Sequence, residues 1–300
     1  MTTKKITRFA AIVLGVSLGG LLALGASADG IQIRPRYTAG DEYVVSLATT
    51  TRTDFHARGD VARSIDDEVE LRYSARVVVV EIAADGSPLR ERHEGVELTV
   101  VQAGGSRSLI KQGAEFEVVR AADGAIQIFH RGKPVDPKLE KIVGHLLARQ
   151  LEHGVAALVD PGRAVEVGET WQIEGDRVQS FMRARGIQDA ELAGPATATL
   201  EALPGDRLAV RYRIPIDGFA LGELPSNTHN ARSRASLEGE VQLDAGGVHR
   251  AIGHSSALAV RIKATMKEPG NTRAASWSVR RSESVVQRSE TLTDQLASRS

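Results

Sequence analysis

Apolar and polar residues alternate along most of the chain from about residue 36 to residue 290, in segments separated by turn dipeptides. This alternation is typical of antiparallel strands, and Asp85-Gly86 and Asp123-Gly124 are tight-turn signals between two such segments. The clearest strand places its apolar residues on the even positions Leu208, Val210, Tyr212, Ile214 and Ile216. The pattern predicts long strands that each bury one face and expose the other.

A helical period replaces this alternation after Asp136. Asp136 suits the N-cap of a helix, Pro137 its first position, and Gly154 a left-handed cap at its end. The apolar stripe has the spacing i, i+3, i+4, i+7, i+8 and i+12 and consists of Leu139, Ile142, Val143, Leu146, Leu147 and Leu151. We expect an amphipathic helix over about 137–153 that packs against the inner face of a sheet.

This helix separates two halves that begin alike. Gly40-Asp41-Glu42-Tyr43 in the first half is echoed by Gly168-Glu169-Thr170-Trp171 in the second. Duplication and convergent strand chemistry explain the echo about equally well. In the second half we expect strands around 173–182 and 196–203, then a turn at 204–206.

The fold class that follows is mainly β, with two antiparallel β-meander halves and one central amphipathic helix. The halves would form a curved sheet, a half-barrel or a sandwich around a shared core. The expected divisions are a signal peptide (1–28), a first β half (29–135), the central helix and linker (136–163), a second β half (164–290) and a polar tail (291–300).

The first residues carry the signature of an export signal. Lys4, Lys5 and Arg8 precede a short apolar run, and Ala26-Ser27-Ala28 has the small residues of a cleavage site. We expect cleavage after Ala28 and a periplasmic or extracellular location. An uncleaved anchor is the alternative, but the apolar run is short for a membrane span. No later apolar run approaches spanning length, so the mature chain is expected to contain no integral membrane segment.

Charge and cysteine content narrow the function classes further. Removal of Lys4, Lys5 and Arg8 from the 38 basic residues leaves 35 against 38 acidic ones, a mature net charge of about −3. This balance argues against nucleic acid as a partner. The chain contains no cysteine, which excludes disulfides, a cysteine nucleophile and a lipidated cysteine.

Two short motifs suggest chemistry only weakly. The segment 253–257, with the sequence GHSSA, comes near a nucleophile elbow, but Ala257 replaces the second glycine and no helical pattern follows. Asp66-Asp67-Glu68 lacks the alternating ligands and turn glycine of a calcium loop. Polar strand residues explain both motifs better, so we expect no catalytic residue and no cofactor.

The histidines do not form a pattern that predicts a metal site. His249 and His254 have opposite strand parity, and His145 and His153 are more than two turns apart on the predicted helix. His130 could approach them only through the tertiary fold. No metal is therefore expected.

Charged residues form rows on the outward faces of the predicted strands. Arg211 and Arg213 lie on one strand, Arg261 and Lys263 on another, and Glu238 and Glu240 on a third. Cross-strand charge pairing on a solvated face is the simpler interpretation. The functional alternative is a docking surface for an anionic head group or a partner protein.

Apolar residues of the helix and strands are the candidate ligand site. The simpler interpretation is plain core, but a movable helix would make them the lining of an apolar pocket. The candidate lining residues are Leu139, Ile142, Leu146, Leu208, Val210, Tyr212, Leu258 and Val260.

The signal segment, the paired openings and the central helix resemble an uncharacterised family of secreted bacterial β-rich proteins with a V-x-V-G-[DE]-T-W signature in the second half. Val165 to Trp171 match that signature, with Glu169 at the position that also accepts Asp. The family is similar in outline to the lipoprotein-carrier (LolA/LppX-like) half-barrel. The resemblance implies a periplasmic or surface-exposed binding or structural module and brings no catalytic residues.

The leading hypothesis is therefore an exported, non-catalytic module that binds a hydrophobic, lipid-like molecule or a cell-envelope protein. A structural or protein-interaction module with a filled core is the first alternative. A hydrolase whose residues no spacing reveals is the second.

Overall fold

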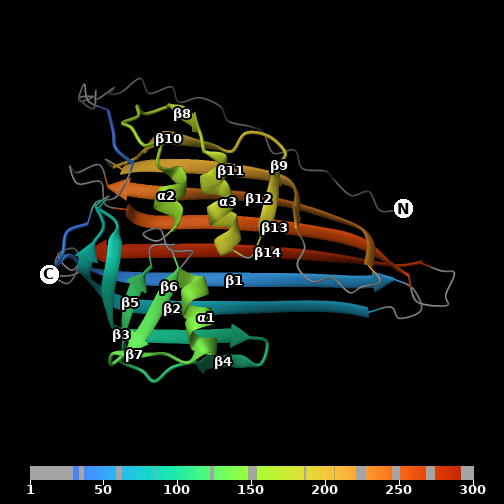
Figure 1. Cartoon of the computed structure of the whole chain (residues 1–300), viewed down its shortest axis with the longest axis horizontal. Coiled ribbons are helices and arrows are strands. Elements are labelled where there is room, and N and C mark those ends of the chain that lie inside the picture. Colours follow the sequence, from blue (N-terminus) through green and yellow to red (C-terminus); the bar gives the residue numbers. More distant parts are fainter. Residues whose placement is uncertain are drawn as a thin grey trace, which may run out of the picture. The chain divides into compact units, whose positions relative to one another are not determined.

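One antiparallel sheet contains every named strand of the computed structural model (Figure 1). The described residues are 30–33, 37–58, 63–84, 86–121, 125–147, 154–185, 187–205, 207–220, 228–244, 251–267 and 274–291. Within these ranges the sheet has fourteen strands, and three short helices accompany it. The predicted class, mainly β and antiparallel with few helices, is confirmed.

The first seven strands form a meander that ends at the first helix. Their bounds are β1 Glu42–Arg58, β2 Arg63–Ile82, β3 Pro88–Gln102, β4 Gly105–Ser108, β5 Ala114–Arg120, β6 Ile126–His130 and β7 Lys133–Pro134. The helices are α1 Pro137–Leu147, α2 Ala156–Val159 and α3 Gly175–Ala184. The remaining strands are β8 Thr170–Gln172, β9 Gln188–Leu192, β10 Thr197–Leu203, β11 Arg207–Ala220, β12 Thr228–Asp244, β13 Ala251–Lys267 and β14 Ala274–Thr291.

The first and last long strands join the two halves. The spatial order is β7-β6-β5-β3-β2-β1-β14-β13-β12-β11-β10-β8, with β4 beside β3 and β9 beside β11. The ladder between β1 and β14 runs from Tyr43, opposite Thr291, to Arg58, opposite Ser276. The two predicted meanders are therefore continuous in one sheet.

Strand register brings the apolar positions of both halves to the same face. Leu47 of β1 lies opposite Tyr73 of β2 and, on its other side, opposite position 287 of β14. Position 287 lies opposite His254 of β13, which in turn lies opposite Val241 of β12. Directly opposite residues point to the same side of a sheet, so the buried side chains share one face, called here the inner face.

The helices cover this inner face in two places. In the first half, Val143, Leu146 and Leu147 of α1 are fully buried in a core with side chains such as Val45 and Leu98. In the second half, the buried residues of α2 and α3 join a separate core. These helical members are Ala156, Leu158, Val159, Val178, Phe181 and Met182.

The predicted central helix is confirmed at its start but not at its end. The Asp136 Oδ1 atom accepts a hydrogen bond from the Lys138 amide at 2.9 Å, as an N-cap does. In the described residues α1 ends at Leu147, because residues 148–153, with Leu151 and His153, lie outside them. Gly154 was expected to stop the helix, but it lies in a π-helical turn that leads into α2.

The strand expected around 173–182 is wrong, because Gly175–Ala184 forms α3. Val178, Phe181 and Met182 have the helical spacing i, i+3 and i+4, and all three are buried. This stripe is too short to stand out beside the long alternating segments, and burial against the sheet decides the conformation. Several other expectations concern the signal segment 1–28, Asp85, the dipeptide at 123–124, Asp206, His249 and the tail 292–300, all of which lie outside the described residues.

Gly239 of β12 has no side chain, so residues of the two neighbouring strands can interact above it. Gly239 lies opposite Tyr212 of β11 and opposite Ser256 of β13. A Cβ atom on Gly239 would lie 2.4 Å from both the Cζ and the hydroxyl oxygen of Tyr212. The tyrosine ring therefore occupies the space above the glycine, and its hydroxyl group reaches His254 of β13.

We expect Gly239→Ala to lower the free energy of unfolding by about 1–3 kcal/mol or more, because the new methyl group would displace a buried ring. Gly144→Ala on α1 is the control, since a Cβ atom there meets nothing within 4 Å. It should raise stability by about 0.5–1 kcal/mol through helix propensity. Urea unfolding of both variants measures the two effects, and equal shifts would contradict the crossing of Tyr212 over Gly239.

Candidate functional site

The candidate pocket residues fall into two separate cores. Leu139, Ile142 and Leu146 pack in the first core. The strand residues belong to the second core, which contains Leu208, Val210, Tyr212 and Leu258, with Val260 packed against it. The structure thus does not bring the helical and strand members together around one space, and a pocket beneath the helix stays a prediction.

Polar side chains are buried within the second core. The Tyr212 hydroxyl group and His254 Nε2 are joined by a hydrogen bond of 2.9 Å. Burial, with a smaller contribution from the positive charge of Arg185, lowers the pKa of His254 to about 3. Burial also raises the pKa of Tyr212 to about 12. Both groups are therefore neutral at physiological pH.

A buried ion pair ties α3 to the centre of the sheet. Arg185, which follows α3, donates from Nη1 to Glu283 Oε1 of β14 at 3.1 Å, and each side chain is only 1% exposed. The guanidinium group also lies 4.5 Å from the centre of the Phe181 ring. The strand that joins the two halves is thereby linked to a helix of the second core.

The first core contains a comparable polar network. The Tyr43 hydroxyl group donates to Glu91 Oε1 at 2.7 Å, and the Tyr73 hydroxyl group lies 2.6 Å from His93 Nδ1. His93 Nε2 and Glu91 Oε2 are 3.5 Å apart. Burial, together with the Glu91 charge, raises the pKa of Tyr73 well above its ordinary value. All four side chains are buried, so the network has the character of core structure.

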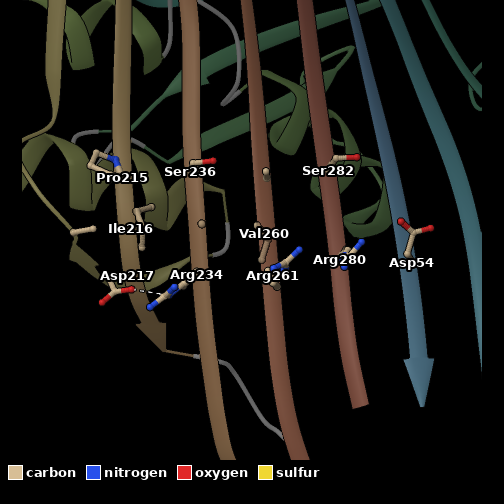
Figure 2. Close-up of a pocket in the computed structure, with 13 residues that line it drawn as sticks. Asp54, Pro215, Ile216, Asp217, Arg234, Ser236, Val260, Arg261, Arg280 and Ser282 are labelled. Atoms are coloured by element: carbon tan, nitrogen blue, oxygen red, sulfur yellow. Dashed lines mark ion pairs between the residues drawn. The ribbon is translucent and has the colours of Figure 1, made fainter. Parts of the chain in front are cut away.

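The accessible candidate site is a groove on the other face of the sheet, the outer face. The groove has a volume of about 780 Å³ and crosses β11, β12, β13, β14 and β1 (Figure 2). It is lined by Asp54, Ala193, Pro215, Ile216, Asp217, Arg234, Ala235, Ser236, Ala259, Val260, Arg261, Arg280 and Ser282.

Three arginines lie in one row along this groove. Arg234 of β12 is directly opposite Arg261 of β13, which is directly opposite Arg280 of β14 (Figure 2). Asp217 and Asp54 occupy the two ends of the row, on β11 and β1. Adjacent strands are roughly 4.8 Å apart, so the sheet holds three like charges side by side.

The aspartates neutralise only part of this charge. Arg234 Nε forms an ion pair with Asp217 Oδ1 at 2.8 Å. Asp54 Oδ1 lies 3.7 Å from Nε of Arg52 on the same strand. No ion pair joins Asp54 to Arg280 in the described part of the chain. Arg261 and Arg280 are exposed and likewise form no ion pair with any described residue.

A second row extends the positive charge toward the ends of the strands. Arg232 lies opposite Lys263, two residues beyond Arg234 and Arg261 on the same strands. Both side chains are exposed and form no ion pair within the ranges described. We call the five cations the basic patch: Arg232, Arg234, Arg261, Lys263 and Arg280.

Other charged rows on the outer face are internally paired. Arg211 contacts Glu240 at 3.0 Å and Glu201 at 2.9 Å, and Arg213 contacts Glu238 at 3.2 Å. Cross-strand pairing is thus confirmed for Arg211 and Arg213. Arg261 and Lys263 form no such pair with a described residue. The sequence could have revealed this difference only if the strand register were known.

The arrangement can bind anions. Guanidinium groups bind carboxylate and phosphate oxygens through paired hydrogen bonds, and an anion between Arg261 and Arg280 would relieve their mutual repulsion. Among the described residues, no group of three or more histidine, aspartate or glutamate side chains is placed to hold a metal ion.

No helix in the described part of the chain has the length and apolar character needed to cross a membrane.

No protein-family model matches the chain, and no curated protein matches its sequence. A structure titled for lipid–protein interactions in lipovitellin is similar, with 10% identity and a TM-score of 0.40 over 85% of this chain and 26% of that one. The chain thus spans about a quarter of lipovitellin.

Two bacterial structures are also similar. The outer membrane protein OprG of Pseudomonas aeruginosa has 7% identity and a TM-score of 0.24, with coverage of 85% and 98%. A LolA superfamily protein from Nitrosomonas europaea has 9% identity and a TM-score of 0.12, with coverage of 82% and 86%. Likenesses at these TM-scores carry no argument about function.

Removal of the buried carboxylate with Glu283→Ala should lower the free energy of unfolding by about 3–5 kcal/mol, because the charge of Arg185 would lose the anion it faces. The control is Glu238→Ala, whose side chain is 62% exposed and paired with Arg213. That variant should leave stability nearly unchanged. Urea denaturation compares them, and a small loss for Glu283→Ala would show that the ion pair is dispensable.

Stability should fall as the pH drops below about 6.5, the ordinary pKa of histidine, toward the folded-state pKa of His254 of about 3. In that window the unfolded chain binds a proton that the folded chain does not. The contribution of His254 is thus complete above pH 6.5, and about 2 kcal/mol of it is lost between pH 7 and pH 5. Urea unfolding of His254→Gln at both pH values should show a correspondingly smaller loss.

Proposed function

We propose that this protein is an exported, non-catalytic module that binds a lipid-like molecule with an anionic head group. The observation that carries this proposal is the row of Arg234, Arg261 and Arg280 along the outer groove, in which only Arg234 has a carboxylate partner among the described residues. Export itself rests on the predicted signal segment, with a periplasmic or extracellular location after cleavage near Ala28.

The charge of the row supports an anionic head group. Like charges directly opposite each other on a sheet are destabilising, so Arg261 and Arg280, which have no ion pair with a described residue, weaken the free protein. A phosphate or carboxylate group between them would form charge-assisted hydrogen bonds to both. Selectivity against a zwitterionic head group follows, because its cation would meet the same two arginines.

The remaining lining supports a partly apolar ligand. Pro215 and Ala259 contribute carbon surface to the groove, and Ser236 and Ser282 are small. The volume of about 780 Å³ lies within the range of ordinary small-molecule sites, roughly 300–1,000 Å³. An acyl chain could lie along these residues while its head group contacts the arginines.

A structural or protein-interaction module is the second candidate. It is supported by the burial of most candidate pocket residues, including Leu146 and Val210, in two cores. An acidic envelope protein would then be the partner of the basic patch. The hydrolase alternative gains no support from His93 and His254, because both side chains are buried.

Calorimetric titration with dodecyl phosphate and with zwitterionic dodecylphosphocholine, both below their micelle concentrations, tests the proposal. The mature protein should bind dodecyl phosphate at least tenfold more tightly. The double variant Arg261→Gln/Arg280→Gln should bind it roughly tenfold or more weakly, as expected for lost hydrogen bonds to a charged group.

The matched control is Arg72→Gln, which removes an exposed arginine that is paired with Glu70 at 2.9 Å on β2. Its affinity for dodecyl phosphate should equal that of the unmodified protein. Equal affinity for the two detergents, or an equal loss in both variants, would contradict the proposed role of the arginine row.

A further inference from the structure

We infer that the ends of the long strands dock on an anionic lipid bilayer, with cations on their outer face and apolar side chains on their inner face. The inference rests on the proposed function, because the basic patch adjoins the groove. It adds a partner, the membrane surface, and it depends on residues outside the groove.

The first observation is that side-chain burial on the inner face decreases toward the ends of the long strands. On β1, Leu47 and Thr49 are 2% and 3% exposed, but Thr51, Thr53 and Phe55 are only partly buried. On β2 the burial of the inner-face side chains also decreases toward the start of the strand. Its side chains change from buried at Tyr73, through partly buried at Leu71 and Val69, to 38% exposed at Ile65.

Apolar residues continue along the inner face toward the strand ends. Ile65 of β2 lies opposite Phe55 of β1, which lies opposite position 279 of β14, and that position lies opposite Ile262 of β13. These residues share the inner face because they are directly opposite in register. Ile65, Phe55 and Ile262 thus mark an apolar row that retains access to solvent at the strand ends.

The second observation is that the same strand ends carry cations on their outer face. Ile262 stands between Arg261 and Lys263 in the sequence, and position 279 is followed by Arg280. Alternation along the strands therefore places cations on one side and apolar residues on the other. Arg232 and Lys263 lie beyond the groove lining, closer to the strand ends.

These two observations together select the partner. A purely apolar strand end would suit any hydrophobic surface, and a purely basic one any anion. Apolar residues and lysine or arginine on one element fit the boundary between anionic head groups and acyl chains. Asp217 offsets the charge of Arg234, and Asp66 is paired with Arg52 at 3.0 Å. The exposed Asp67 of β2 lies on the inner face, opposite Thr53 of β1. The remaining charge of the basic patch is that of Arg232, Arg261, Lys263 and Arg280, which form no ion pair with a described residue.

The strand ends also differ from the rest of the outer face. Arg211 and Arg213 have carboxylate partners, whereas Arg232 and Lys263 have none among the described residues. The net attraction to an anionic surface is therefore concentrated where the described side chains of the inner face are only partly buried. A bilayer approached from this end would meet both kinds of side chain.

Vesicle sedimentation tests the inference with the mature protein and two lipid compositions. We expect binding to phosphatidylcholine vesicles that contain phosphatidylglycerol, weakening with added salt, and little binding to pure phosphatidylcholine. The double variant Arg232→Gln/Lys263→Gln should bind the anionic vesicles roughly 25-fold more weakly, about fivefold for each cation near the surface. Its affinity for dodecyl phosphate should stay unchanged, because neither residue lines the groove.

The apolar contribution has a matched pair of variants on one strand. Ile65 and Ile82 lie near opposite ends of β2 and are 38% and 37% exposed. Ile65→Ser should weaken binding to anionic vesicles at least threefold, roughly the effect of losing part of a buried apolar side chain, whereas Ile82→Ser should not. Equal effects of the two substitutions, or no effect of either, would overturn docking by the strand ends.

The two proposals can fail separately. Loss of dodecyl phosphate binding in Arg261→Gln/Arg280→Gln, with vesicle binding that is weakened but still depends on Arg232, Lys263 and Ile65, supports both the groove and docking by the strand ends. Absence of binding to anionic vesicles at low salt overturns the docking inference, whatever the result with dodecyl phosphate.

Discussion

The structure depends on strand register, because register holds the buried apolar positions of a very wide sheet on one face. A shift of one residue between β1 and β14 would move Leu47 and its neighbours on one half to the side opposite the buried residues of the other half. The two cores could not then lie on the same face. The helices favour the same register, because α1 packs in one core and α2 and α3 pack in the other, on the same inner face. The buried link between Arg185 and Glu283 adds a specific contact at the strand where the halves meet.

Single-sided burial also explains where binding chemistry is available. Most side chains of the inner face pack in the two cores, and His93 and His254 are enclosed there. The side chains of the outer face do not pack in either core, so charged residues can be placed there without a burial cost. Most of that charge is neutralised across strands, as at Arg213 and Glu238. The exception at Arg261 and Arg280 is therefore informative, because nothing in the packing of the sheet requires two adjacent arginines without an ion pair among the described residues.

Much of the fold could be predicted from alternation and spacing, since both reflect local geometry. The strand through Tyr212 and the start of α1 at Asp136 follow from residue period and capping chemistry alone. The conformation of α3 could not be predicted, because Val178, Phe181 and Met182 form only a short stripe whose burial depends on distant strands. The arginine row could not be predicted from the sequence for a similar reason. Arg261 was identified as an outward cation, but its neighbours on β12 and β14 are set by register, which no single segment encodes.

The pairing of β1 with β14 has a consequence for how the chain acquires its structure. The central ladder joins Tyr43 to Thr291, positions separated by almost the whole described sequence. Contacts this distant form slowly, because a very long loop must close before any of them is gained. Until β14 arrives, β1 presents an unpaired edge that other chains could join. The protein is therefore expected to fold late and as a whole, and to be most prone to aggregation while its last strand is still unplaced.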